Sequence, residues 1–139
     1  MKPFFESHAL HFSCTRCGRC CATPGDYFVF LTGDEAERIR VHRGLSSAWF
    51  RRRYLRRLED GRLVLVSGAS DRCIFLDAQA RCSIYPVRPL QCRTYPFWPE
   101  LVGNRRAWHG EKRRCEGIDR GDAVPVGEIR RAFNACLDR

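Results

Sequence analysis

Four cysteines within eight residues constrain this chain more than any other feature of its sequence. The residues Cys14, Cys17, Cys20 and Cys21 form the pattern C-x2-C-x2-C-C. A C-x2-C step can present both thiolates to one metal ion, because the tight turn between them aims both sulfurs inward. Successive steps of this kind are typical of iron–sulfur proteins, in which a distant cysteine completes the ligand set. Since adjacent cysteines point in different directions, the pattern favours a polynuclear cluster or two neighbouring sites.

The state of the cysteines follows from the expected compartment. The segment Met1–His11 has no apolar run of secretory length, and no stretch approaches the roughly 20 apolar residues of a membrane span. We therefore expect a cytoplasmic protein with no membrane partner, in which thiols are kept reduced. Nine reduced cysteines in a chain of 139 residues point to metal ligation or redox chemistry rather than to a disulfide framework.

Further ligand candidates are isolated in the sequence, and each lies at the end of a predicted element: Cys73, Cys82, Cys92 and Cys115. Together with the first four they make eight thiols, enough for two four-thiolate sites. The spacing does not assign individual cysteines to a site. The alternative is that several are buried small hydrophobic residues. Cys136 is different, because it shares the apolar side of the last predicted helix with Phe133 and Leu137, and we expect it in the core.

Helical signals are clearest in the first half of the chain. Thr32 and Glu35 have the spacing of a capping box, which predicts a helix that ends at Gly44. The spacing of apolar residues predicts a second helix over residues 46–58. Residues 27–31, rich in aromatic and β-branched side chains, predict a strand.

The second half of the chain reads as short strands, loops and one final helix. Residues 63–66 predict a buried strand, and a β-hairpin is predicted to join 73–76 to 82–85. Four prolines in 86–99 leave room only for a short helical turn. A C-terminal helix is predicted at about 126–137. The expected fold is α+β: a small, single, loop-rich domain over residues 1–139, with a few helices and a short β-hairpin, organised around the cysteines.

Two blocks of the sequence resemble a known family. One is Cys14–Cys21, and the other is Cys82–Phe97, with the sequence C-S-I-Y-P-V-R-P-L-Q-C-R-T-Y-P-F. The segment Cys73–Asp77 fits a third block between them. The chain is similar to the bacterial cysteine-cluster proteins that are named for a CxxCxxCC motif and described as zinc- or iron-chelating. The resemblance covers roughly Phe12–Cys115, which is most of the chain.

This resemblance implies a ligand set for the metal and leaves Cys136 outside it. The implied metal-binding residues of the cysteine-cluster region 12–115 are Cys14, Cys17, Cys20, Cys21, Cys73, Cys82, Cys92 and Cys115. The role of the family is poorly defined, so the resemblance implies metal binding and no particular pathway.

Arginines and histidines near the cysteines are further candidates. Arg88 and Arg93 flank Cys92, where guanidinium groups can offset the negative charge of a thiolate site and hydrogen-bond to sulfur. Because arginine supplies 23 of the 25 basic residues, chance proximity is the alternative. His11 and His109 could each bind a metal through a ring nitrogen, although isolated histidines are more often surface residues.

These observations support two classes of function. The first is a cysteine-ligated metalloprotein that holds an iron–sulfur cluster or zinc or iron ions, for electron transfer or metal handling with a redox or client protein as partner. We favour iron over zinc because the first four cysteines are contiguous. The alternative is a zinc-stabilised module that binds nucleic acid or protein through its arginine-rich surface, consistent with a net charge of +9. Nucleic acid is not the favoured partner. No P-loop, Rossmann glycine pattern or Ser/His/Asp arrangement suggests catalytic activity of its own.

Overall fold

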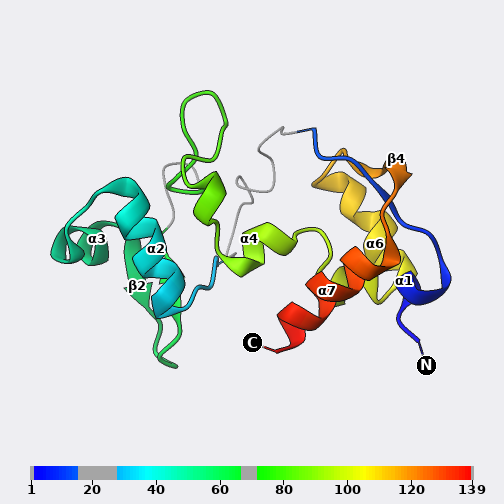
Figure 1. Ribbon diagram of the computed structural model, residues 1–139, viewed down its shortest axis with the longest axis horizontal. Coiled ribbons are helices and arrows are strands. Elements are labelled where there is room, and N and C mark those ends of the chain that lie inside the picture. Colours follow the sequence, from blue (N-terminus) through cyan, green and yellow to red (C-terminus); the bar gives the residue numbers. More distant parts are fainter. Residues whose placement is uncertain (1, 16–27, 67–71, 139) are drawn as a thin grey trace. The chain divides into compact units, whose positions relative to one another are not determined.

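The computed structural model describes residues 2–15, 28–66 and 72–138, and it confirms a mixed α+β fold (Figure 1). The chain divides into two compact units. The terminal unit comprises Met1–Cys17 and Thr94–Arg139, and the middle unit comprises Gly18–Arg93. The assignment of residues 1–139 to a single domain stays a prediction.

The middle unit begins its regular structure with the predicted capping box. Thr32 Oγ1 accepts a hydrogen bond from the Glu35 N–H, and the Glu35 carboxylate accepts one from the Thr32 N–H. Helix α2 (Gly33–Arg43) follows and ends at Gly44, whose φ of 66° is left-handed. Both ends of this helix are therefore as the sequence predicts, because each end depends on local backbone chemistry.

The second helix is shorter than predicted. Helix α3 (Ser47–Tyr54) ends before Leu55, and the next three residues form strand β2 (Leu55–Arg57). This strand pairs antiparallel with β3 (Leu63–Leu65), so that Leu55 lies opposite Leu65. The prediction of helix over 46–58 is wrong at its end, because an apolar partner strand follows within a few residues and captures the segment in a ladder.

Strand β3 has partners on both sides. Phe30 forms a bridge with Val64, and two further backbone hydrogen bonds join segment 29–31 to Leu63 and Leu65. The observed hairpin is thus β2–β3. The predicted hairpin over 73–85 is reduced to a single bridge between Leu76 and Cys82. The core of this unit consists of Leu31, Ala36, Ile39, Phe50, Leu65, Phe75 and Ile84.

Two short helical segments complete the middle unit. A 3-10 turn, η3 (Tyr85–Val87), precedes helix α4 (Leu90–Thr94), whose last residue belongs to the terminal unit. The short helical turn expected among the prolines is therefore present. The peptide bond between Tyr95 and Pro96 is cis.

The terminal unit combines one strand pair with short helices and a longer final helix. Strand β1 (His11–Phe12) pairs antiparallel with β4 (Ile118–Ala123). The helical elements are α1 (Phe4–Ser7), α5 (Pro99–Val102), α6 (Arg105–Gly110), η4 (Glu111–Arg113) and α7 (Val126–Leu137). Figure 1 shows the N-terminal segment running beside β4. The core is formed by Phe5, Leu10, Phe97, Val102, Trp108, Ile118 and Ile129.

Helix α7 has the bounds that its sequence predicts. Ile129 is buried, and Phe133 packs against Phe5 with ring centroids 5.2 Å apart. Leu137 ends the helix and is exposed, in contrast to its predicted place on the apolar side. Among residues 2–15, 28–66 and 72–138, no helix is long and apolar enough to cross a bilayer.

Candidate metal-binding site

The predicted ligands are divided between the two units. Cys14 and Cys115 belong to the terminal unit, and Cys73, Cys82 and Cys92 belong to the middle unit. Cys14 is exposed, whereas the other four are half-buried. The predicted ligands Cys17, Cys20 and Cys21 lie outside the described residues. Within the part of the chain that the structure describes, no three His, Cys, Asp or Glu side chains are grouped so that they could hold a metal ion.

The terminal unit brings the segments of Cys14 and Cys115 together. The Ser13 N–H donates to the Gly117 carbonyl at 3.1 Å, and Thr15 Oγ1 donates to the Glu116 carboxylate at 2.6 Å. These bonds flank Cys14 on one side and lie one and two residues beyond Cys115 on the other. The contact requires glycine at position 117, because a Cβ there would lie 2.1 Å from the Ser13 carbonyl oxygen.

Cys73 and Cys82 lie on the two arms of one turn in the middle unit. The Leu76 N–H donates to the Cys73 carbonyl at 3.0 Å, and Leu76 bridges to Cys82. Both cysteines pack against the apolar core of this unit. The turn between them is closed by Asp77, whose Oδ1 accepts the N–H groups of Gln79 and Arg81 at 2.9 Å each. An Asx-type turn thus replaces the longer predicted hairpin.

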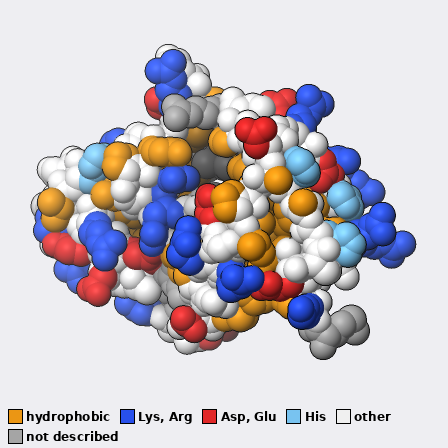
Figure 2. Space-filling view, turned by 45° about the vertical axis from the view of Figure 1, so that its right-hand side comes forward, with side chains coloured by type: hydrophobic (Ala, Val, Ile, Leu, Met, Phe, Trp, Pro, Cys, Tyr) orange, Lys and Arg blue, Asp and Glu red, His pale blue; other side chains and the backbone are white. Residues whose placement is uncertain are grey.

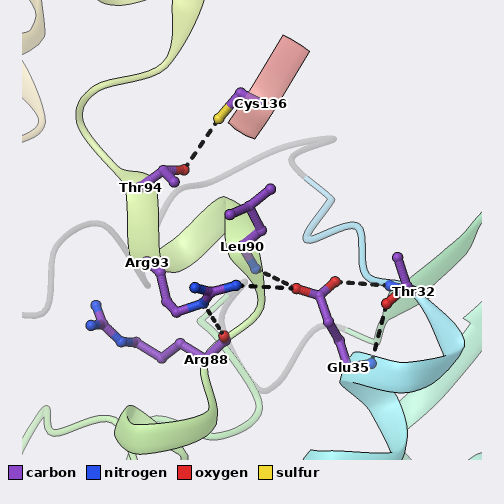
Figure 3. Close-up of polar contacts among 7 residues, drawn as sticks. All are labelled: Thr32, Glu35, Arg88, Leu90, Arg93, Thr94 and Cys136. Atoms are coloured by element: carbon purple, nitrogen blue, oxygen red, sulfur yellow. Dashed lines mark hydrogen bonds and ion pairs between the residues drawn. The ribbon is translucent and has the colours of Figure 1, made fainter. Parts of the chain in front are cut away.

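Cys92 lies on α4, and the start of this helix is held by a buried carboxylate (Figure 3). Glu35, which is 8% exposed, accepts the Leu90 N–H at 2.6 Å through Oε2 and the Thr32 N–H at 2.9 Å through Oε1. The Arg93 guanidinium lies 3.9 Å from the same Oε2. The carboxylate of Glu35 therefore joins the first turns of α2 and α4, and its charge is matched by backbone dipoles and one cation.

The side chain of Gln91 joins the same helix to the segment of Phe28 and Phe30. Its Nε2 donates to the Phe28 carbonyl at 2.9 Å, and its Oε1 accepts the Phe30 N–H at 2.9 Å. The side-chain amide therefore pairs with the backbone as a neighbouring strand would. This clamp holds Phe28 and Phe30 beside the helix that carries Cys92, and Phe28 follows Cys21 by seven residues in the sequence. Gln91 could not be identified from the sequence, because no local motif signals an amide that acts across about sixty positions.

Arg88 and Arg93 brace the chain around Cys92. The Arg93 Nε donates to the Arg88 carbonyl at 3.0 Å (Figure 3). The Arg88 Nε donates to the Tyr85 carbonyl at 3.0 Å, and its guanidinium lies 3.8 Å from the centroid of the Tyr85 ring. The two arginines thus contact backbone carbonyls, the Tyr85 ring and the Glu35 carboxylate. A role for either arginine toward bound metal stays a prediction.

The two candidate histidines use the same ring atom in hydrogen bonds. Nδ1 of His11 lies 2.9 Å from the Gly121 carbonyl, and Nδ1 of His109 lies 2.6 Å from Asp119 Oδ2. Both lie in the terminal unit. Cys136 is half-buried there, and its Sγ donates to Thr94 Oγ1 at 3.4 Å. The Cys136 thiol therefore contacts the Thr94 hydroxyl, in addition to lying on the apolar side of α7.

The carboxylate of Asp119 has three hydrogen-bonding or ionic partners. It accepts the Trp108 Nε1–H at 3.0 Å and the Lys112 ammonium at 2.9 Å in addition to His109. Partial burial raises the pKa of Asp119, but the hydrogen bonds from His109, Lys112 and Trp108 outweigh it, so this pKa lies below its ordinary value. Its φ of 64° is left-handed, a conformation that aspartate tolerates.

The chemistry of the donor set fits zinc or iron. Thiolate sulfur is the preferred ligand of structural zinc and of iron–sulfur clusters. The structure brings predicted ligands into neighbouring segments in two places, Cys14 with Cys115 and Cys73 with Cys82. Short turns and a glycine contact, rather than long helices, position these residues, as is usual for cysteine-rich metal sites.

Comparisons with known proteins agree with this donor chemistry. The CxxCxxCC family model, described as a "putative zinc- or iron-chelating domain", matches residues 13–116. An uncharacterized protein of Methanocaldococcus jannaschii is 29% identical over 121 residues, which is 83% of this chain and 62% of that protein. The chain therefore spans less than two thirds of the length of this relative. No solved structure matches the chain.

Proposed function

This chain belongs to the CxxCxxCC family of zinc- or iron-chelating domains, and we propose that its eight family cysteines hold the metal. The proposed ligands are Cys14, Cys17, Cys20, Cys21, Cys73, Cys82, Cys92 and Cys115. The function of the chain is then that of a cysteine-ligated metal-binding protein. Catalysis by the chain itself is not part of the proposal.

The observation that carries the proposal is the contact between the segments of Cys14 and Cys115. Two hydrogen bonds and a glycine that admits close backbone approach hold together residues about a hundred positions apart. Closing so long a loop costs entropy, and the contact lies directly beside the pairing of β1 with β4. It supports placing the first and last family cysteines at one metal centre.

The Gln91 clamp supports a second grouping. It joins the helix of Cys92 to the backbone at Phe28 and Phe30, where the chain leaves the cysteine-rich segment. Arg93 and Arg88 brace the same region, and we infer that their positive charge offsets the negative charge of thiolates at the site. Ligands of one cluster drawn from the cysteine-rich segment and from α4 are consistent with this arrangement.

We infer iron, as an iron–sulfur cluster, in preference to zinc. The C-x2-C-x2-C-C segment supplies contiguous thiolates of the kind that wrap a cluster. An iron–sulfur cluster would supply one-electron transfer, whereas zinc is redox-silent. Electron transfer to a protein partner is therefore the proposed role, and metal handling is the alternative if the metal is zinc.

Anaerobic purification followed by a visible spectrum and assays of iron, zinc and acid-labile sulfide tests the metal. Brown protein with sulfide supports the cluster, and colourless protein with bound zinc contradicts electron transfer. Protein from metal-supplemented cells that holds neither metal contradicts the proposal as a whole.

Serine variants of single cysteines test the ligand set. Cys115→Ser should lose metal, whereas Cys136→Ser, a matched thiol outside the family set, should keep it. Unchanged metal content in Cys115→Ser, or equal loss in both variants, would contradict the assignment.

A further inference from the structure

The middle unit contains an open groove that none of the predicted metal ligands lines. Its volume is about 480 Å³, and its walls come from α2, α3 and the β2–β3 hairpin. The apolar residues that line it are Ala36, Phe50, Leu55 and Leu63. The arginines that line it are Arg40, Arg51, Arg56 and Arg57. Figure 2 shows Lys and Arg side chains spread over the face in view, among hydrophobic and acidic side chains.

The groove meets strand β2 at its edge. All three residues of this strand, Leu55–Arg57, line the groove. Side chains of a strand alternate between its faces, and Arg57 lies opposite Leu63, so Leu55, Arg57 and Leu63 share one face of the hairpin. The groove lies over that face, beside the outer edge of β2.

The outward backbone groups of this edge can be assigned from the register. The Val66 N–H donates to Tyr54, and the Leu58 N–H donates to Arg62, so the even-numbered residues of β2 face β3. The N–H and C=O of Arg57 and the C=O of Leu55 consequently point away from β3. None of these three groups has a hydrogen-bond partner among residues 2–15, 28–66 and 72–138.

The charge of the groove is positive and largely uncompensated. Its acidic lining residue, Glu37, is paired with Arg40, whose Nε donates to Glu37 Oε2 at 2.9 Å. In the described part of the chain, Arg51, Arg56 and Arg57 have no carboxylate partner. Arg57 donates instead to the Gly61 carbonyl, and Arg56 lies over the Phe28 ring.

We propose that this groove binds an extended acidic segment of a partner protein, which adds as a strand to the edge of β2. Main-chain hydrogen bonds form at Leu55 and Arg57, carboxylates of the segment meet the arginines, and its alternate apolar side chains rest on the apolar floor. The positive charge of the arginines also disfavours pairing of this edge with a basic segment or with β2 of a second copy, so the edge selects acidic segments. Nucleic acid fits less well, because it offers phosphates to the arginines but no amide groups to the strand edge. This surface is independent of the metal ligands.

Fluorescence anisotropy with a labelled peptide of about ten residues, alternating Asp or Glu with Val or Ile, tests the proposal on the full chain. Arg51→Glu should weaken binding roughly tenfold or more through charge reversal. Arg52→Glu is the matched control, because it makes the same charge change on the next exposed residue of α3, outside the groove lining. It should change the affinity little.

A second peptide separates strand addition from charge attraction. The same sequence with alternate backbone nitrogens methylated keeps its charge but cannot pair with the edge, and it should lose most of its affinity. Equal binding of the methylated peptide, equal weakening by Arg51→Glu and Arg52→Glu, or no binding of the unmodified peptide would overturn the proposal. Tighter binding of a single-stranded DNA oligonucleotide with the same sensitivity to Arg51→Glu would assign the groove to nucleic acid and also overturn it.

Discussion

The side-chain carbonyl of Gln91 accepts a hydrogen bond from the backbone N–H of Phe30 at 2.9 Å, across 61 positions of the sequence. The amide nitrogen of Gln91 completes the pair by donating to the Phe28 carbonyl. The Gln91 side chain therefore makes the two backbone hydrogen bonds that a neighbouring strand would make, and it joins the helix of Cys92 to residues 28–30. This relationship links the fold of the middle unit to its proposed metal chemistry.

Gln91→Glu should lower metal retention. The substitution keeps the size of the side chain but places a carboxylate oxygen against the Phe28 carbonyl, where the donor was, so two acceptors face each other. A mispaired half-buried group costs about 1–3 kcal/mol. Metal content and the rate of metal loss to a chelator measure the effect. Gln79→Glu, on an exposed turn, is the matched control, and equal metal loss in both variants would contradict the role assigned to Gln91.

Glu35→Gln should destabilise the fold by about 1–3 kcal/mol. Both oxygens of Glu35 accept backbone N–H groups, so an amide nitrogen at either position would face a donor. Chemical denaturation measures the loss. Glu37→Gln on the exposed face of the same helix should change stability far less. A stability of the Glu35 variant equal to that of the control would show that the link between α2 and α4 contributes little.

Gly117→Ala should be strongly destabilising, by about 2 kcal/mol or more. The added Cβ would lie 2.1 Å from the Ser13 carbonyl oxygen, and that atom belongs to backbone that cannot rotate away. Gly110→Ala is the control, because a Cβ at position 110 has no neighbour within 4 Å. Thermal unfolding compares the two. A small effect at position 117 would show that the segments of Cys14 and Cys115 can separate at low cost.

Asp119→Asn should cost about 1–2 kcal/mol at neutral pH and progressively less in acid. The folded pKa of Asp119 lies below its unfolded value, because hydrogen bonds from three donors outweigh partial burial. Its contribution is therefore complete above the unfolded pKa of about 3.9 and is lost as the pH falls through the lower folded pKa. Asparagine also accepts the left-handed backbone at this position.

The measurement is the difference in unfolding free energy between wild type and Asp119→Asn from neutral pH to about pH 3, with the exposed Asp122→Asn as control. A difference that is constant with pH would contradict the charge-dependent role of Asp119.

Local signals explain what could be predicted from the sequence. The capping box at Thr32 and Glu35 and the stop at Gly44 depend on neighbouring backbone groups, so both ends of α2 were predictable. The α+β class and the C-terminal helix followed from periodicity in the same way. The cysteine pattern led to the correct family, which covers residues 13–116.

Non-local pairing explains what could not be predicted. Residues 55–57 continue the helical pattern of α3, yet they form a strand because Leu63–Leu65 offers a ladder partner. The second role of Glu35, at Leu90, acts across 55 positions and leaves no local trace in the sequence. The same is true of the Gly117 contact with Ser13, since a glycine gives no indication of which backbone approaches it.

The pairing of β1 with β4 also determines when the terminal unit can form during synthesis. Strand β1 is synthesised before Gly18–Arg93, but Ile118–Ala123, the strand with which it pairs, is translated only after the whole of that unit. The middle unit has its complete sequence earlier and is free to fold first, which inverts the usual N-to-C order of folding. Cys14 is synthesised about a hundred residues before Cys115, its proposed partner at one metal centre, so the interval between the two is when the Cys14 thiol is most exposed to oxidation.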